Sequence, residues 1–170
     1  DGEGNEIASI GEPSTVTYFR SAAKPFQALP FITSGAADAF GFTMDEIALA
    51  CASHSGERIH VQTVSRMLAK IRMTESDLRC GTHLPFYSKE SERMIREGEE
   101  PTQLHNNCSG KHAAMLALGK HIGAYTEDYD LPDNRVQKRI LRCISDFTGV
   151  AEDAIAIGVD GCAAPNFALS

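Results

Sequence analysis

The densest group of reactive side chains in this sequence is the stretch HNNCSGKH at residues 105–112. Cys108 precedes a helix-like segment that carries Lys111 and His112, so backbone N–H groups and the helix dipole favour its thiolate. A thiolate in this position can serve as a nucleophile or as a soft ligand for zinc. A zinc finger is not indicated, because the chain has no Cys-x-x-Cys pair and the His and Cys spacing here does not match one.

The other cysteines divide into turn and core positions. Cys162 lies in the turn VDGCAAP, where the neighbouring Asp160 can order a ligand or bind a substrate ammonium group. Spacing alone leaves open whether Cys108 and Cys162 bind a metal together. Cys51 and Cys143 fall within apolar helical patterns and are expected to be inert core thiols. Five cysteines at wide, irregular spacings argue against a disulfide framework and predict reduced thiols in a cytosol-like compartment.

A serine and a lysine three residues apart form a second reactive group, in the motif RSAAKP. One helical turn would bring the Ser21 hydroxyl and the Lys24 amine onto the same face. Lysine can take the serine proton only if burial or a nearby positive charge keeps the amine neutral, and Arg20 supplies such a charge. The alternative is that Ser21 only caps the helix that follows.

The turn CASHSGE holds a second serine, Ser53, beside a histidine and close to Glu57. Such a group could orient a substrate or relay a proton. Alternatively, Ser55 caps a helix that begins near Glu57. The residues alone do not decide between the two hypotheses.

The elements that must position these groups follow from hydrophobic periodicity and from capping residues. Two short strands, at residues 6–11 and 15–20, are expected to pair with each other. A further, buried strand is expected at residues 154–159. The helical segments, several with capping or stop signals such as the pair Thr43 and Glu46, are 21–34, 43–50, 57–72, 88–98, 108–123 and 136–149.

The arrangement predicts an α/β or α+β fold in which the central helices lie on one side of a mainly antiparallel sheet. The net charge is −7 and the basic residues are scattered, so neither nucleic acid nor a membrane surface is an expected partner. No stretch is long and apolar enough to span a membrane, and no GxGxxG or P-loop follows a strand. The first and last residues resemble interrupted strands, which predicts a single partial domain over residues 1–170.

Four dense motifs follow one another along nearly the whole chain. They are RSAAKPFQALP from Arg20, CASHSGE from Cys51, NNCSGKHAAML from Asn106 and VDGCAAPNFALS from Val159. In this order and at these separations they resemble the asparaginase II family, the bacterial type that includes the Rhizobium asparaginases. The resemblance implies a fold like that of serine β-lactamases and penicillin-binding proteins, and hydrolysis of L-asparagine to L-aspartate and ammonia.

The resemblance also implies roles for nine residues. The implied nucleophile, its base and the second active-site serine are Ser21, Lys24 and Ser53. Two thiolates and a lysine amine are implied as ligands of a zinc ion that supports substrate binding, namely Cys108, Lys111 and Cys162. The residues implied to lie around the substrate are Arg20, His112 and Asp160. A homodimer in the bacterial cytoplasm is expected on the same grounds.

The chain departs from the family pattern in two places. Ala163 stands where family members usually have glycine, so the turn after Cys162 will differ if that position needs a positive φ. The lysine that the family pairs with its second serine would lie beyond Ser170. We therefore expect the 170 residues to correspond to the N-terminal half to two-thirds of such a protein, and to be weakly active or inactive alone.

Two other functions compete with this hypothesis. One is a thiol hydrolase or redox protein that uses Cys108 with His105 or His112, since a cysteine beside a histidine at a helix start is a recognised nucleophile arrangement. The other is a module that binds zinc or an amino acid without catalysis.

Overall fold

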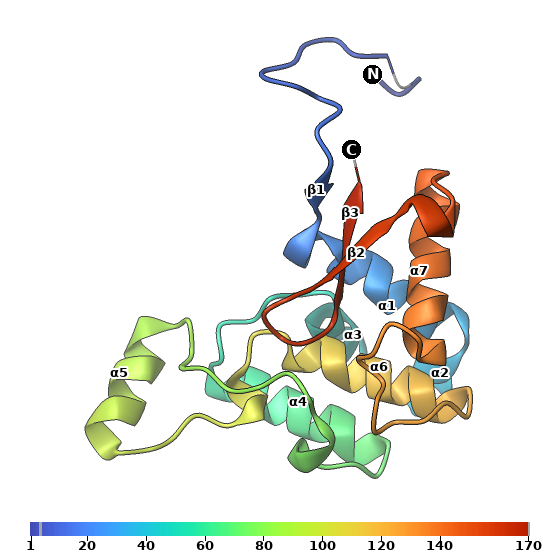
Figure 1. Ribbon diagram of the computed structural model, residues 1–170. Helices are drawn as coiled ribbons and strands as arrows, with labels where there is room; N and C mark the ends of the chain where they lie inside the picture. Colours follow the sequence, from blue (N-terminus) through green and yellow to red (C-terminus); the bar gives the residue numbers. More distant parts are fainter. Residues whose placement is uncertain (4, 170) are drawn as a thin grey trace.

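The computed structural model describes residues 1–3 and 5–169. The turn expected over residues 1–5 includes Gly4, which lies outside the described residues. Helices pack together beneath a small sheet at one end of the molecule (Figure 1). The α-helices are α1 Lys24–Thr33, α2 Ala36–Ala39, α3 Met44–Ala50, α4 Arg58–Lys70, α5 Ser88–Glu97, α6 Ser109–His121 and α7 Arg135–Thr148. The strands are β1 Thr17–Tyr18, β2 Ala156–Val159 and β3 Pro165–Leu169, and short 3-10 turns include η1 Arg20–Ala23.

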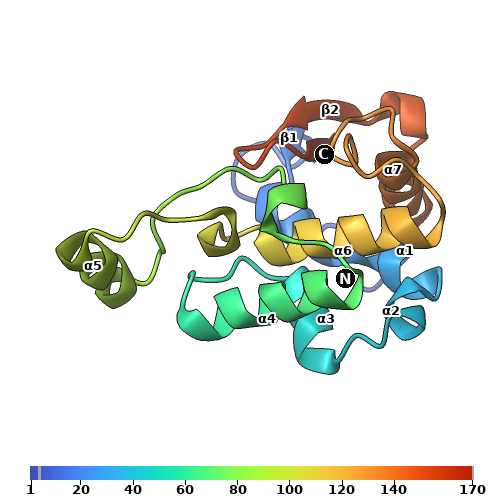
Figure 2. The same cartoon turned by 90° about the horizontal axis from the view of Figure 1, so that it is seen from below.

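Helix α6 is the centre of the helical body and packs against α1, α3 and α4. Its small and apolar residues leave no polar stripe, and every residue from Ser109 to Gly119 is buried. A helix that is apolar all round is enclosed by its neighbours. Figure 2 shows α6 running between α1 and α4. The polar residues of its first turn, which include Lys111, therefore lie in the interior of the protein.

The three strands form an antiparallel sheet in the order β1-β3-β2. Thr17 lies opposite Leu169, and Val159 lies opposite Pro165. The central strand β3 is largely buried. The sheet therefore joins residues from both ends of the described chain directly above the start of α1 (Figure 1).

Two expectations about strands were wrong. Residues 6–11 form no strand, and Thr17–Tyr18 pairs with β3 instead, because the register with β3 supplies the hydrogen bonds that a local hairpin would have supplied. The expected segment 154–159 contains strand β2, but the strand is mostly exposed rather than buried, with Val159 71% accessible. As an edge strand, β2 has a partner on one side only within the described chain.

Most helix boundaries agree with the capping signals. Thr43 and Glu46 form the expected capping box, and α5 and α7 end at Gly98 and Gly149, both in the left-handed region. The hypothesis that Ser55 caps α4 was wrong, because Glu57 is the N-cap residue and the Ser55 hydroxyl donates to its carboxylate. Among the described residues, none of the helices combines the length and the apolar character needed to cross a membrane.

Gly110 gives a direct test of how tightly α6 is enclosed. A Cβ atom there would lie 2.6 Å from the backbone oxygen of Leu49, so Gly110→Ala must push α6 away from α3. We expect a loss of about 1–3 kcal/mol in the free energy of unfolding, measured by urea denaturation. Gly119→Ala is the matched control, because its Cβ would lie 3.2 Å from a movable methyl group of Val136, and it should stay within about 1 kcal/mol of wild type. Equal stability of the two variants would contradict this packing.

Candidate active site

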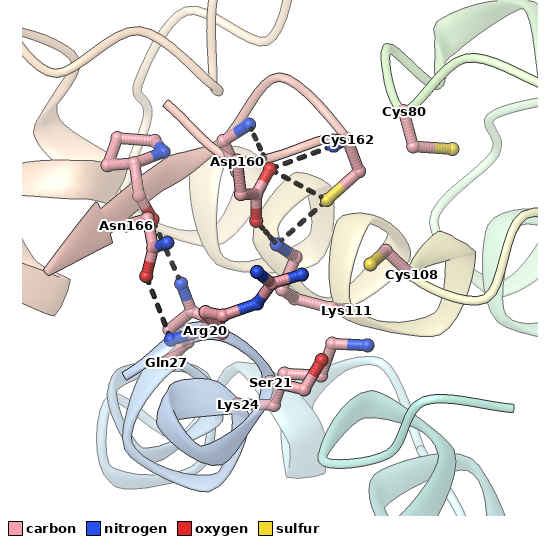
Figure 3. Close-up of polar contacts among 12 residues, drawn as sticks. Arg20, Ser21, Lys24, Gln27, Cys80, Cys108, Lys111, Asp160, Cys162 and Asn166 are labelled. Atoms are coloured by element: carbon pink, nitrogen blue, oxygen red, sulfur yellow. Dashed lines mark hydrogen bonds and ion pairs between the residues drawn. The ribbon is translucent and has the colours of Figure 1, made fainter. Parts of the chain in front are cut away.

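An open cleft of about 430 Å³ lies where the sheet meets the first turns of α1 and α6. Seven of the nine residues singled out in the sequence line it: Arg20, Ser21, Lys24, Cys108, Lys111, Asp160 and Cys162. Figure 3 shows how these side chains converge from α1, α6 and the turn after β2. The fold thus brings together groups that are up to 142 positions apart in the sequence, from Arg20 to Cys162.

Two hydroxyls and an amine form a continuous hydrogen-bonded chain at one side of the cleft. The Lys24 Nζ donates to the Ser53 Oγ at 2.7 Å, and the Ser53 hydroxyl donates to the Ser21 Oγ at 3.0 Å. Both serines are exposed, whereas Lys24 is 2% accessible. Ser53 therefore lies between Ser21 and Lys24, and its hydroxyl connects the two ends of the SxxK motif by hydrogen bonds.

The environment of Lys24 depresses its basicity. Burial lowers the pKa of this amine, and the charge of Lys111 lowers it further, while the thiolate of Cys108 acts in the opposite direction. The amine also donates to the backbone oxygens of Ala52 at 3.0 Å and Asn107 at 3.3 Å. At a given pH, a larger fraction of Lys24 is therefore in the neutral form that a general base requires than is the case for a surface lysine.

The backbone before Ser21 is held in an unusual conformation. Arg20 has φ +52°, in the left-handed region that few side chains adopt. Its N–H donates to the Oδ1 of Asn166 at 3.0 Å, which ties this residue to β3. The interpretation of Ser21 as a helix cap was wrong, because it lies within η1 and no side chain caps that turn.

The two cleft cysteines influence each other's ionisation. Their mutual interaction is the main cause that lowers the pKa of Cys108 and raises that of Cys162, while the Cys162 Sγ donates to the Asp160 Oδ1 at 3.0 Å. Burial opposes ionisation of both thiols, whereas the charge of Lys111 favours it. Cys108 is therefore the more acidic of the two thiols, and Cys162 keeps its proton.

Lys111 reaches the same corner of the cleft from the first turn of α6. Its Nζ lies 3.2 Å from the Cys162 Sγ and 3.1 Å from the Asp160 Oδ2. Burial lowers the pKa of this amine, but its interactions with Cys162, Asp160 and Cys108 outweigh that effect and leave the pKa raised. Lys111 thus holds its proton until something displaces it.

His112 lies away from the cleft, although the resemblance implied a place around the substrate. Its ring is fully buried and does not line the cleft, and its Nδ1 lies 2.7 Å from the Tyr129 hydroxyl oxygen. Its Nε2 has no hydrogen-bond partner among the described residues. Burial lowers the pKa of His112 well below its usual value, so the ring is neutral.

Several residues that shape the site were not predicted from the sequence. The His83 Nε2 accepts the backbone N–H of Asn107 at 3.1 Å, which holds the carbonyl that Lys24 contacts. The Asn106 Oδ1 accepts the N–H of Cys108 at 2.8 Å and so orders the start of α6. The two asparagines lie inside the stretch 105–112, where the pair of amides was a usable signal. Nothing in the sequence around His83 marks it.

The remaining cysteines behave as expected for inert thiols. Cys51 and Cys143 are half-buried and burial raises the pKa of each. Burial also raises the pKa of Cys80, to about 12. All five cysteines are unpaired.

The cleft does not contain a conventional cluster of metal ligands. Over residues 1–3 and 5–169, no group of three or more His, Cys, Asp or Glu side chains is placed to hold a metal ion. Two thiols and a lysine amine nevertheless meet within one corner, and the thiols are soft donors of the kind that zinc prefers. The donor set fits zinc once Lys111 and Cys162 lose their protons.

Comparison with known protein families gives the wider context of this site. The family model described as L-asparaginase II matches residues 1–170. The chain belongs to the L-asparaginase II family. Membership indicates an amidohydrolase of the asparaginase type with a small-molecule substrate. A search of curated proteins found no match to the chain.

The turn after Cys162, where the sequence was expected to depart from the family pattern, has an unusual backbone conformation. Ala163 adopts φ +66°, in the left-handed region that glycine adopts readily. The Asp160 Oδ1 accepts the N–H groups of Cys162 at 2.9 Å and Ala164 at 3.0 Å, which holds the turn in this conformation. The turn therefore keeps a shape that suits glycine although alanine occupies it.

Ala163→Gly should relieve this strain. We expect the free energy of unfolding to rise by about 0.5–1 kcal/mol, measured by urea denaturation, because glycine has no Cβ to clash at positive φ. Ala151→Gly, at an exposed position with negative φ, is the matched control and should not stabilise the protein. A loss of stability at both positions would show that the Ala163 conformation is not strained.

Proposed function

We propose that this protein is an L-asparaginase that hydrolyses L-asparagine to L-aspartate and ammonia through an acyl-enzyme on Ser21. The observation that carries the proposal is the hydrogen-bonded chain from Ser21 through Ser53 to Lys24. A serine is a poor nucleophile until a base takes its proton, and this chain connects an exposed hydroxyl to a buried amine of lowered pKa.

The proton of Ser21 reaches the base through Ser53. When the Lys24 amine is neutral, the Ser21 hydroxyl donates to Ser53 and the Ser53 hydroxyl donates to Lys24. The direction seen in the structure, from Lys24 to Ser53 to Ser21, is that of the protonated amine. The Ser21 oxygen bonds to the carboxamide carbon while two protons shift along the chain.

The acyl-enzyme then forms and breaks down in balanced steps. The C–N bond breaks, the leaving amine takes a proton back from Lys24 through Ser53, and ammonia departs. Water next attacks the ester carbon, gives its proton to the same relay and releases L-aspartate with Ser21 restored. The Ser21 backbone N–H, which has no hydrogen-bond partner within the described chain, is a donor for the oxyanion of both steps.

We propose a zinc site formed by Cys108, Lys111 and Cys162. These groups converge at one corner of the cleft, and the thiolate character of Cys108 supports metal binding. When bound, zinc supplies a Lewis-acidic charge that supports substrate binding. The residues themselves must first release the protons held by Lys111 and Cys162.

Charged groups around the cleft suit an α-amino acid. Arg20 lines the cleft with an exposed side chain and would pair with the substrate α-carboxylate. Asp160 would bind the substrate ammonium group through the partly exposed carboxylate that also contacts Lys111. Because His112 is fully buried, we assign it a positioning role behind Lys111 rather than a contact with substrate.

The family resemblance supports further proposals about the protein as a whole. We propose that the helices and small antiparallel sheet belong to a fold of the serine β-lactamase type, and that the protein is a cytoplasmic homodimer. Five unpaired cysteines are consistent with a reducing compartment.

The lowered pKa of Cys108 keeps a second function open, hydrolysis through a cysteine nucleophile. Cys108 lines the same cleft. Over the described residues, however, neither His105 nor His112 makes a hydrogen bond to its sulfur. The serine chain is therefore the better supported nucleophile.

Replacement of the two rival nucleophiles separates these functions. Ser21→Ala should lower kcat for ammonia release from L-asparagine at least about 1,000-fold in the full-length protein, because no other hydroxyl completes the relay. Cys108→Ala should raise KM more than it lowers kcat. Ser65→Ala, an exposed serine on α4, is the matched control. Wild-type turnover by Ser21→Ala would refute the serine mechanism, and abolition by Cys108→Ala alone would favour the thiol hydrolase.

Zinc affinity should depend strongly on pH. The raised pKa values of Lys111 and Cys162 mean that both groups hold protons near neutral pH, so falling pH favours the proton over the metal. We expect the apparent Kd for zinc, measured by chelator competition, to rise by about tenfold or more for each pH unit from 9 to 6. Lys111→Met should bind zinc more weakly at pH 9 and show a shallower pH slope. An affinity that stays flat over this range would exclude Lys111 as a ligand.

A further inference from the structure

Two amide side chains with no assigned role lie beside the nucleophile. Gln27 comes from α1, six residues after Ser21, and Asn166 comes from β3. Both line the same cleft as Ser21. Figure 3 shows the two side chains next to each other and to Arg20.

The hydrogen bonds of Asn166 determine which way its amide faces. The Arg20 backbone N–H can only donate, so the Asn166 atom 3.0 Å away must be the Oδ1. The Nδ2 group, which carries two N–H donors, consequently faces away from Arg20. It makes no hydrogen bond to any of the described residues, and Asn166 is only partly buried. Asn166 thus offers an unused donor to the cleft.

The contacts of Gln27 determine its orientation in the opposite sense. The Gln27 Nε2 donates to the backbone oxygen of Pro165 at 3.3 Å, which identifies the nitrogen and leaves the Oε1 on the other side of the amide. Gln27 is 5% accessible, and its Oε1 accepts no hydrogen bond within the part of the chain that the structure describes. The Oε1 is not among the fully buried unpaired atoms of the described residues, so a ligand in the cleft can reach it. Gln27 therefore offers an unused acceptor to the cleft in which Asn166 offers a donor.

A donor and an acceptor that line one cleft match a primary carboxamide, which presents one oxygen and one NH₂ group. We propose that Asn166 and Gln27 recognise the substrate carboxamide and distinguish it from a carboxylate, with the Asn166 Nδ2 donating to the carbonyl oxygen and the Gln27 Oε1 accepting from the NH₂ group. This inference rests on the proposed function and adds the residues that determine its selectivity.

The physical basis of the selectivity is asymmetric. A carboxylate in the same position would place a second oxygen against the Gln27 Oε1, where two acceptors meet without a proton between them. A site built to hydrogen-bond one group rejects an analogue that leaves its buried polar atoms unpaired. The product L-aspartate should therefore bind more weakly than L-asparagine and leave the cleft readily.

Asn166→Asp tests the donor while it keeps the local structure. The carboxylate has the same shape, and its oxygen still accepts the Arg20 N–H, but no N–H remains to meet the substrate. Binding is measured by calorimetry of the full-length protein in the Ser21→Ala background, so that L-asparagine is not consumed. We expect the Kd for L-asparagine to rise at least about tenfold. Asn5→Asp, an exposed position outside the cleft, is the matched control and should leave the Kd unchanged.

Gln27→Met tests the acceptor. Methionine has a similar length and no oxygen, so the preference for L-asparagine over L-aspartate, taken as the ratio of the two Kd values, should fall at least about tenfold. Gln62→Met on the exposed face of α4 is the matched control and should keep the ratio. Because this variant also loses the contact with Pro165, a thermal denaturation scan must show that it is folded at the titration temperature.

The outcomes separate this inference from the function on which it rests. If the Ser21→Ala protein binds L-asparagine and neither Asn166→Asp nor Gln27→Met changes the Kd values, the two amides only hold the backbone and the inference is wrong while the proposed function stands. If the Ser21→Ala protein binds neither amino acid and wild type releases no ammonia, the proposed function fails and the inference fails with it. Selective loss of L-asparagine binding in both variants supports the inference.

Discussion

The enclosure of the Lys24 amine is the constraint around which the cleft is organised. An amine can be buried only where its hydrogens find acceptors, and here three oxygens from two separate turns supply them: Ala52 O, Ser53 Oγ and Asn107 O. These contacts tie the start of α1 to the turn after α3 and to the turn before α6. The same contacts that satisfy the amine also place the Ser53 hydroxyl against Ser21. The hydrogen bonding of the buried amine and the placement of the two hydroxyls therefore depend on one cluster of atoms.

Strained backbone flanks this cluster on both sides of the cleft. Arg20 and Ala163 adopt positive φ values that cost roughly 1–2 kcal/mol for a residue with a Cβ. Each is held by a polar side chain, Asn166 for the first and Asp160 for the second. Such conformations persist where the surroundings over-determine them, which is common where a reactive group must be aimed. Ser21 directly follows Arg20, and Cys162 directly precedes Ala163. The strained residues therefore lie next to the two side chains whose orientation in the cleft matters most.

The helices and their ends were largely predictable, whereas the sheet was not. Periodicity and capping are local signals, so α4, α5 and α7 and the box at Thr43 could be read from neighbouring residues. The pairing of β1 with β3 joins segments more than 140 positions apart, and no local pattern encodes it. Individual site residues could be recognised in the sequence as reactive residue types. That they lie together in one site could be predicted only from the order of the four motifs. His83, Gln27 and Asn166 act through contacts with residues distant in the sequence, and such contacts leave no local pattern.

The all-round burial of α6 links the chemistry of the cleft to the integrity of the whole helical body. Lys111 can occupy its place only when the neighbouring helices have closed around the rest of α6. Any metal or amino acid that binds the assembled cleft therefore favours the folded protein by mass action, in proportion to how far its concentration exceeds its Kd. A ligand held by a few side chains at the first turn of one helix would then raise the melting temperature of the entire domain, and the occupancy of the site becomes part of the protein's resistance to unfolding.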